Sequence, residues 1–288
     1  MLAYLQLIRP LNCLMAGIAV CIGGWLVGGF SQELLLAAGI AFLITAGGNA
    51  LNDYIDLEAD KINKPGRPLP SKRITEETAL IFSFLLFILG ISLSTFLNLF
   101  ILGIAILNST LLVIYSVRLQ DKLFLGNLTI AWLVGSTFLF GAAVYGRFLL
   151  PGFLALLAGL TTLSREIIKD FEDLEGDRQA WLKKLAKGIR KVVAERFKIG
   201  PNGVILKHRK AGLGLAGFAL LLAVCISPLP WFLSLLSDKY LWLLIPADFC
   251  FLYSFVLLLK KRKPWSRMSK SIKIGMLLGL FAFLLGLF

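Results

Sequence analysis

Long apolar stretches separated by short polar segments run along the whole chain. Because a helix needs about 20 apolar residues to cross a bilayer, this pattern predicts nine membrane-spanning helices. We expect them at roughly residues 10–30, 33–52, 77–97, 99–117, 124–145, 149–167, 212–236, 240–259 and 272–288. The third and fourth spans meet near residue 98, which predicts a tight hairpin. An odd number of spans places the two termini on opposite sides of the membrane.

Composition agrees with a membrane protein. The 288 residues are 58% hydrophobic and only 16% charged, with a mean hydropathy of +0.81, which is unlike an ordinary soluble domain. We expect one all-α integral membrane domain over residues 1–288 and no nucleic-acid partner. The four cysteines lie in apolar spans without metal-ligand spacing and should pack as small apolar side chains. The single His208 lies in a basic segment, so no histidine-based site is expected.

The basic residues predict the orientation. If the N-terminus is inside, every Lys and Arg except Arg147 and Lys239 lies on the inner side, as the positive-inside rule requires. We therefore expect a multi-pass protein of the cell membrane with a cytoplasmic N-terminus and an outer C-terminus.

Two acid-rich clusters follow the second and sixth spans and share the spacing i, i+4, i+7, i+11. They are Asn49, Asp53, Asp56 and Asp60, and Glu166, Asp170, Asp173 and Asp177. On a helix, this spacing puts all four side chains on one face. Ten of the 17 acids fall within residues 53–60 or 166–177, both at expected cytoplasmic ends of spans. Ionisable groups are costly in membranes and usually functional.

Stacked carboxylates at the C-terminal ends of helices are unfavourable unless a cation is present. Mg²⁺ prefers oxygen ligands and commonly binds one or two carboxylates together with substrate phosphates. The clusters therefore predict Mg²⁺ ions that bridge to a diphosphate, with Arg9, Lys64, Arg67 and Lys169 offsetting the remaining phosphate charge. A cation transporter remains an alternative, although the acids lie near one membrane face rather than at mid-bilayer.

Two polar segments follow the acidic clusters. Residues 53–76 contain three prolines and a glycine between Lys64 and Ser71, which predicts an ordered turn. Residues 169–210 are strongly basic. Within them, residues 180–197 could form an amphipathic helix that lies on an anionic membrane or caps a cytoplasmic opening, or a solvated charged loop.

The acidic motifs also resemble those of a known family. Residues 52–60 resemble the N-x-x-x-D-x-x-x-D motif of the UbiA superfamily of intramembrane prenyltransferases, and residues 165–177 resemble its second D-x-x-x-D motif. Arg9-Pro10-Leu11-Asn12 and Gly126-Asn127 extend the resemblance over nearly the whole chain. It implies nine transmembrane helices around a central cavity, with residues 53–76 and 169–210 as cytoplasmic cap loops and a prenyl diphosphate held by Mg²⁺ at a cytoplasmic active site.

Site residues follow from the motif match. The resemblance implies metal ligands at Asn52, Asp56, Asp60, Asp173 and Asp177. It implies catalytic roles for Asp56, Asp60, Asp173, Asp177 and Lys169. It implies substrate binding by Arg9, Asn12, Asn52, Lys64, Arg67, Tyr115, Lys122 and Asp170. The family's Tyr-x-x-x-Lys pattern after the fourth span is altered here, because Leu119 and Gln120 follow Tyr115 and the next lysine is Lys122.

The segment at residues 63–71 distinguishes among acceptors. It resembles the N-K-P-x-R-P-L-P-S loop of archaeal digeranylgeranylglyceryl phosphate synthases, and also that of chlorophyll and homogentisate prenyltransferases. The additional basic residues suit a phosphorylated acceptor. The resemblance thus implies transfer of a geranylgeranyl group from geranylgeranyl diphosphate to the C2 hydroxyl of geranylgeranylglyceryl phosphate, a step of archaeal ether-lipid synthesis. Membrane lipids would surround the protein. Prenylation of an aromatic acceptor by the same chemistry is the alternative.

Overall fold

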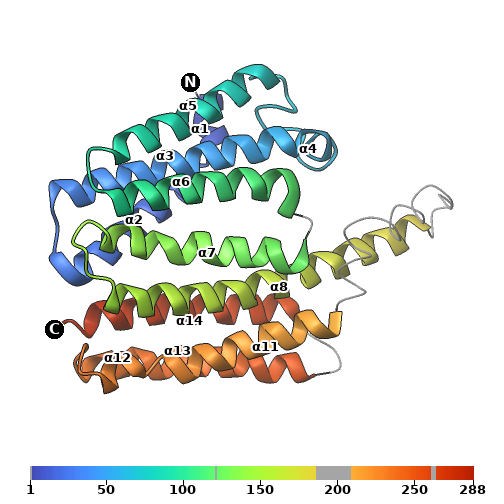
Figure 1. The fold of residues 1–288 in the computed structure, drawn as a ribbon. Helices are drawn as coiled ribbons and strands as arrows, with labels where there is room; N and C mark the ends of the chain where they lie inside the picture. The colour runs from blue at the N-terminus through green and yellow to red at the C-terminus, as the bar shows by residue number, and fades with distance from the viewer. Residues whose placement is uncertain (1, 121, 186–208, 261–263) are drawn as a thin grey trace. The chain divides into compact units, whose positions relative to one another are not determined.

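The structure is a computed structural model that describes residues 2–120, 122–185, 209–260 and 264–288, with the backbone alone at 59, 62 and 174–185. Regular secondary structure in these residues is helical (Figure 1). The elements are α1 (Leu2–Ile8), α2 (Pro10–Gly28), α3 (Gln32–Ile55), α4 (Leu57–Asn63), α5 (Glu76–Ser94), α6 (Leu99–Ile114), the π-helical turn η1 (Tyr115–Leu119), α7 (Leu123–Ala142), α8 (Leu149–Leu185), α11 (Arg209–Ile226), α12 (Leu229–Phe232), α13 (Lys239–Leu259) and α14 (Trp265–Leu285).

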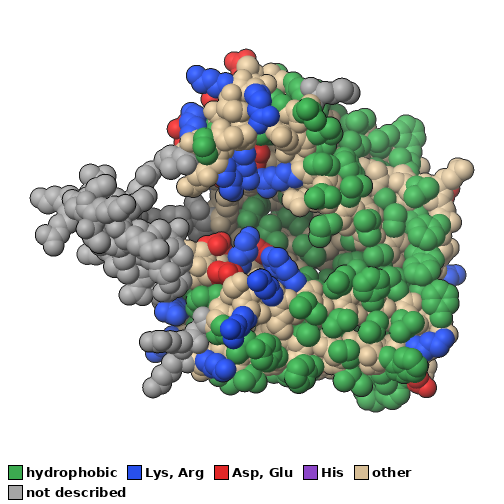
Figure 2. All heavy atoms as spheres, turned by 180° about the vertical axis from the view of Figure 1, so that it is seen from behind, with side chains coloured by type: hydrophobic (Ala, Val, Ile, Leu, Met, Phe, Trp, Pro, Cys, Tyr) green, Lys and Arg blue, Asp and Glu red, His purple; other side chains and the backbone are tan. Residues whose placement is uncertain are grey.

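Nine helices within the described residues are long and apolar enough to cross a membrane, which confirms the expected all-α class and number of spans. Apolar side chains cover much of the right-hand part of the face seen in Figure 2. Leu99 and Trp242, for example, are 83% and 74% exposed. Large exposed apolar surfaces of this kind are unusual on soluble monomers and suit contact with lipid.

The expected start of the last span at residue 272 is wrong, because α14 begins at Trp265. Arg267, Lys270 and Lys273 lower the hydropathy of its first turns. Met268 and Ile272 in the same turns are fully buried, so this part of the helix is amphipathic rather than uniformly apolar.

The sixth span is also longer than expected. Its sequence predicted an end near residue 167, but α8 is a single helix of 37 residues that continues to Leu185. Residues 169–185, which the resemblance placed in the second cap loop, are therefore helical, as the spacing of the second acidic cluster assumed up to residue 177 and as their many strong helix formers allow. Residues 180–185 are the end of α8, while the remainder of the expected amphipathic segment and His208 lie outside the described residues.

The chain divides into two compact units. Unit 1 comprises Met1–Gln120 and Leu133–Ala155, and unit 2 comprises Asp121–Trp132 and Leu156–Phe288. Helices α7 and α8 each contribute one part to either unit. The first acidic cluster belongs to unit 1 and the second to unit 2.

Unit 1 is built around α3, which packs against α2 and α5 (Figure 1). Two glycines allow α2 and the second half of α7 to approach backbone to backbone. A Cβ atom at Gly141 would lie 1.9 Å from the carbonyl oxygen of Val20, and one at Gly23 would lie 2.2 Å from that of Phe138. Only glycine permits this approach. The close contact with α7 fixes the position of α2 within unit 1.

In unit 2, α13 packs against α11 and α14, and the apolar face of α8 is buried. Ile167, Ile168 and Phe171 are at most 2% exposed. The Phe171 ring stacks on Trp265 with centroids 5.7 Å apart. Burial of this face fixes the rotation of α8 and leaves Glu166, Asp170 and Asp173 on its more accessible side.

Candidate active site

The first acidic motif lies across a break between two helices. Helix α3 ends at Ile55 and α4 begins at Leu57, with Asp56 at the junction. The helical hydrogen bonds continue, from the Asp56 N–H to the Asn52 carbonyl at 2.9 Å and from the Asp60 N–H to the Asp56 carbonyl at 2.8 Å. Asn52 also donates from Nδ2 to Asp56 Oδ2 at 2.8 Å. Asn52 and Asp56 therefore form one pair on the accessible side.

Asp53 and Asp60 instead form a buried network with arginine. They are 3% and 5% exposed. Arg67 Nη1 donates to Asp53 Oδ1 at 3.0 Å and also to Asp60 Oδ2. Arg9 Nη2 donates to the same Asp53 oxygen, and Lys64 Nζ lies 4.0 Å from Asp60. Buried carboxylates need such partners because desolvation of an unpaired charge is costly.

A strained backbone turn aims Arg9 at this network. Arg9 has φ of 52°, which is uncommon for a residue other than glycine, and the following proline disfavours the right-handed helical region. The turn leaves the Ile8 carbonyl at the end of α1, where it accepts from Asn49 Nδ2 at 2.8 Å and from Cys13 Sγ at 3.1 Å. Asn49 therefore supports the turn that carries Arg9.

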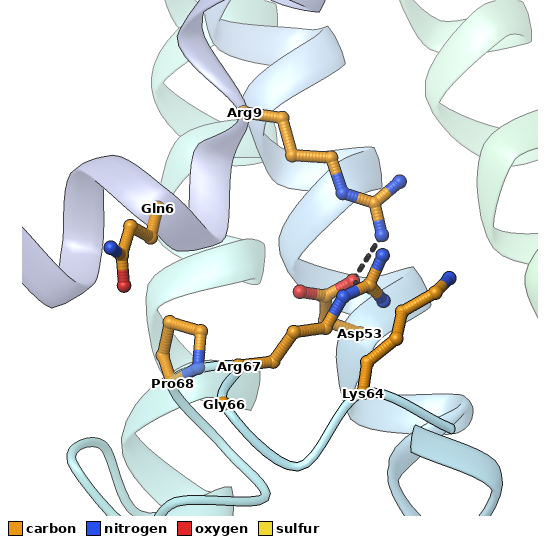
Figure 3. Close-up of a pocket in the computed structure, with 7 residues that line it drawn as sticks. All are labelled: Gln6, Arg9, Asp53, Lys64, Gly66, Arg67 and Pro68. Carbon is orange, nitrogen blue, oxygen red and sulfur yellow. Dashed lines mark hydrogen bonds and ion pairs between the residues drawn. The ribbon is translucent and has the colours of Figure 1, made fainter.

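These groups line an open pocket of about 510 Å³ in unit 1 (Figure 3). Its lining residues are Gln6, Arg9, Asp53, Lys64, Gly66, Arg67 and Pro68. Both guanidinium groups are directed at Asp53, and Lys64 extends beside them. These three cationic side chains outnumber Asp53 and Asp60, the two carboxylates that pair with them, and the excess of positive charge suits phosphate.

The proline-rich segment is ordered by its own hydrogen bonds. Ser71 Oγ donates to the Arg67 carbonyl at 2.6 Å, and Arg73 Nη2 donates to the Gly66 carbonyl at 2.6 Å. This confirms the expected ordered turn and explains how Arg67 is presented. Glu58 and Lys61 form a separate exposed pair at 2.5 Å, and this hydrogen bond raises the pKa of Lys61.

A residue from the end of the fourth span also reaches the first motif. Gln120 Nε2 donates to both oxygens of Asp56, at 3.0 Å and 3.2 Å. Tyr115, which begins the π-helical turn before Gln120, is half-buried. Asn12, in the first turn of α2, is exposed. Sequence reasoning noted Gln120 only as a departure from the Tyr-x-x-x-Lys pattern and missed its contact with Asp56.

The second motif lies along α8 in unit 2. Asn127, near the start of α7, donates from Nδ2 to Asp170 Oδ2 at 2.7 Å. Glu166 forms an ion pair with Arg165, and Lys169 Nζ lies 3.9 Å from Glu166 Oε2. Asp173 is exposed one turn further along, whereas the side chain of Asp177 lies outside those described, and Lys122 is exposed.

Neither unit contains a preassembled acidic cage among its described residues, since no three His, Cys, Asp or Glu side chains there are grouped to hold a metal ion. The donor chemistry nevertheless fits Mg²⁺, which commonly uses one or two carboxylates and takes the rest from water and substrate phosphate. Asn52 uses its amide nitrogen toward Asp56, so its oxygen can still act as a ligand. Asp60 would share its carboxylate with Arg67.

The sequence matches one family over almost its whole length. A profile of the UbiA prenyltransferase family matches residues 11–281. The chain belongs to this family. A relative named digeranylgeranylglyceryl phosphate synthase, from Methanopyrus kandleri, is 40% identical over 288 residues and 100% of both chains. The expected resemblance to the archaeal branch of the UbiA family is thus confirmed.

Solved structures of UbiA proteins share the fold. One described as digeranylgeranylglyceryl phosphate synthase has a TM-score of 0.82 and 38% identity, covering 99% of this chain and 97% of its own. A UbiA homolog from Archaeoglobus fulgidus, described as bound to GPP and Mg²⁺, has a TM-score of 0.64 and 17% identity, covering 98% of this chain and 99% of its own. At that identity the second similarity shows the fold alone.

Proposed function

We propose that this UbiA protein transfers a geranylgeranyl group from geranylgeranyl diphosphate to the C2 hydroxyl of geranylgeranylglyceryl phosphate. The observation that carries this proposal is the 40% identity, over 100% of both chains, to a relative named for that product. The cationic pocket around Arg9, Lys64 and Arg67 supports a substrate pair in which both members carry phosphate.

Mg²⁺ is the proposed cofactor, and its ligands would come from Asn52, Asp56, Asp60, Asp173 and Asp177. When bound, it would stabilise the negative charge that develops on the departing diphosphate. The Mg²⁺ named with the A. fulgidus homolog and the Asn52–Asp56 pair support this assignment.

The basic and polar side chains orient the substrates. Arg9, Lys64 and Arg67 bind phosphate oxygens through charge-assisted hydrogen bonds. Lys169 lies at the second motif, where it offsets phosphate charge. We assign the remaining substrate contacts to Asn12, Asn52, Tyr115, Lys122 and Asp170.

The reaction breaks the bond between the allylic carbon and the diphosphate oxygen and forms a bond from that carbon to the acceptor oxygen. The acceptor hydroxyl releases its proton, so the products are the ether, diphosphate and a proton. As the carbon gains cationic character, the apolar helix walls exclude water that would otherwise intercept it. The diphosphate leaves with the bonding electron pair, so positive groups around it lower the barrier.

Acceptor identity is tested with purified protein, geranylgeranyl diphosphate and Mg²⁺. We expect a dialkylated product with geranylgeranylglyceryl phosphate and none with 4-hydroxybenzoate or homogentisate. Product formed only with an aromatic acid would overturn the lipid acceptor and favour the alternative of an aromatic prenyltransferase.

The catalytic role of the motifs is tested by changing both Asp56 and Asp173 to alanine. We expect transfer to be abolished, while Glu58→Ala, which removes an exposed acid paired only with Lys61 among described residues, retains it. Transfer that survives the double change would refute the metal–diphosphate assignment. Metal-dependent ion flux in proteoliposomes without any transfer would favour the transporter alternative.

A further inference from the structure

Asp56 differs from the two buried acids of the first motif in what holds its carboxylate. Asp53 and Asp60 each accept from a guanidinium group. Asp56 accepts from amide groups, at 2.8 Å from Asn52 and at 3.0 Å and 3.2 Å from Gln120. Among the described residues, Asp56 forms no ion pair with Lys or Arg.

This difference has an electrostatic consequence. A guanidinium orients a carboxylate and cancels its charge, whereas an amide orients it and leaves the charge intact. A carboxylate has about four lone-pair positions, and the three amide contacts leave room for a further ligand. The Asp56 carboxylate is therefore held in a fixed orientation, and no Lys or Arg among the described residues offsets its charge, which is the arrangement a metal ligand requires.

A local irregularity in the fourth span makes the contact possible. The turn Tyr115–Leu119 is π-helical and closes with a hydrogen bond of 2.9 Å from the Gln120 N–H to the Tyr115 carbonyl. Compared with an α-helical turn, it accommodates one more residue and so changes the direction of the side chain that follows. Such turns are rare and occur frequently at functional sites. Here the turn contacts α3 and presents Gln120 to Asp56.

We propose that Gln120 is a positioning residue that, together with Asn52, holds the Asp56 carboxylate ready for Mg²⁺. The inference rests on the proposed function and adds a residue to its metal site. It also gives the departure from the Tyr-x-x-x-Lys pattern a physical meaning. A lysine that reached Asp56 would form an ion pair and compete with the cation, whereas neutral Gln120 only orients the carboxylate.

The test compares Gln120→Ala and Gln120→Lys with Gln32→Ala, which removes an exposed glutamine at the other end of α3. Mn²⁺ binding is measured by titrating each purified variant with inorganic diphosphate present, because the proposed site takes part of its ligands from phosphate. The electron paramagnetic resonance signal of free Mn²⁺ is followed and compared with a protein-free sample at the same diphosphate concentration. Loss of an outer-shell partner typically weakens metal binding by about tenfold or more, and we expect this for Gln120→Ala. Gln120→Lys should bind Mn²⁺ more weakly still, and Gln32→Ala should match the unmodified protein.

Activity adds a second measurement. For Gln120→Ala, the Mg²⁺ concentration for half-maximal transfer should rise by the same factor, while kcat at saturating Mg²⁺ stays within about twofold, because oriented binding rather than chemistry is lost.

Mn²⁺ affinities within twofold of the unmodified protein for both Gln120 variants would overturn the inference. The inference would also be overturned if Gln120→Lys bound Mn²⁺ as tightly as the unmodified protein. That result would show that the side chain at position 120 need not be neutral. Absence of Mn²⁺ binding by the unmodified protein would overturn this inference and the metal assignment together, whereas normal binding with a different acceptor product would overturn only the proposed function.

Discussion

Arg67 Nη1 donates a hydrogen bond of 3.0 Å to Asp53 Oδ1 and so ties the proline-rich segment to the buried end of α3. Arg9 donates to the same oxygen from the turn between α1 and α2. A carboxylate that already carries two guanidinium groups is poorly suited to bind a cation as well. Asp53 therefore anchors the anion-binding pocket, while Asp56, on the same motif, is free of such partners among described residues.

Changing Asp53 to asparagine should weaken substrate binding without changing the need for metal. The substitution removes the charge that orients both arginines, and charge-assisted hydrogen bonds are worth about 1.5–3 kcal/mol, so the KM for geranylgeranyl diphosphate should rise by about tenfold or more. Steady-state kinetics over a range of diphosphate and Mg²⁺ concentrations measures both parameters. An unchanged KM would show that Asp53 does not organise the pocket.

Changing Asp56 to asparagine should give the opposite pattern. The side chain keeps its size but loses its charge, so the Mg²⁺ concentration for half-maximal activity should increase by about tenfold or more. The same two-dimensional kinetics serves here, with Asp53→Asn as the matched comparison. If both variants raised the same parameter, the division of the first motif into an anchoring acid and a metal-binding acid would be wrong.

In unit 2, Asn127→Ala should reduce kcat/KM by about tenfold, because it removes the 2.7 Å hydrogen bond that orients Asp170. Thr129→Ala is the matched control. Thr129 is equally buried, but among the described residues its hydroxyl donates to the Leu125 carbonyl of its own helix and to no other group. Equal activities of the two variants would argue that Asp170 does not take part in substrate binding.

Much of the fold could be predicted from sequence because each span is an almost uninterrupted apolar run. The errors occur where helix ends depend on tertiary contacts. The first turns of α14 carry Arg267 and Lys270 on one face but bury Met268 on the other, and no hydropathy average separates those faces. The extension of α8 to Leu185 was predicted only in part. The spacing of the second acidic cluster assumed a helix up to residue 177, but the apolar run ends near residue 167, and hydropathy alone does not show that Glu, Lys and Leu continue the same helix.

The candidate site could be predicted only where its contacts are local. Asn52 and Asp56 are four residues apart on a helix, so their pairing follows from spacing. The contacts of Asp56 with Gln120 and of Asp170 with Asn127 join residues 64 and 43 positions apart. Such contacts depend on how spans pack, and the π-helical turn before Gln120 has no signature in the apolar pattern.

The close approach of α2 and α7 predicts a large effect of one added methyl group. In Gly141→Ala the Cβ atom would meet the backbone of Val20 at 1.9 Å, so the helices must separate, and overpacking of this kind typically costs about 1–3 kcal/mol. We expect a lower midpoint of thermal unfolding in detergent. Gly39→Ala in α3 is the control, because nothing lies within 4 Å of its added carbon. Equal midpoints would show that the contact between α2 and α7 is looser than 1.9 Å implies.

The orientation inferred from basic residues predicts which side of the membrane each loop faces. We propose that the N-terminus and both acidic motifs are cytoplasmic and the C-terminus is outside. Single cysteines replace Glu77, just after the first cytoplasmic segment, and Arg147, between α7 and α8, in a background where the four native cysteines are serine. Both positions are exposed. In intact cells a membrane-impermeant maleimide should label only Arg147→Cys, and permeabilised cells should show labelling of both. Labelling of Glu77→Cys alone in intact cells would reverse the orientation, and with it the side from which the substrates enter.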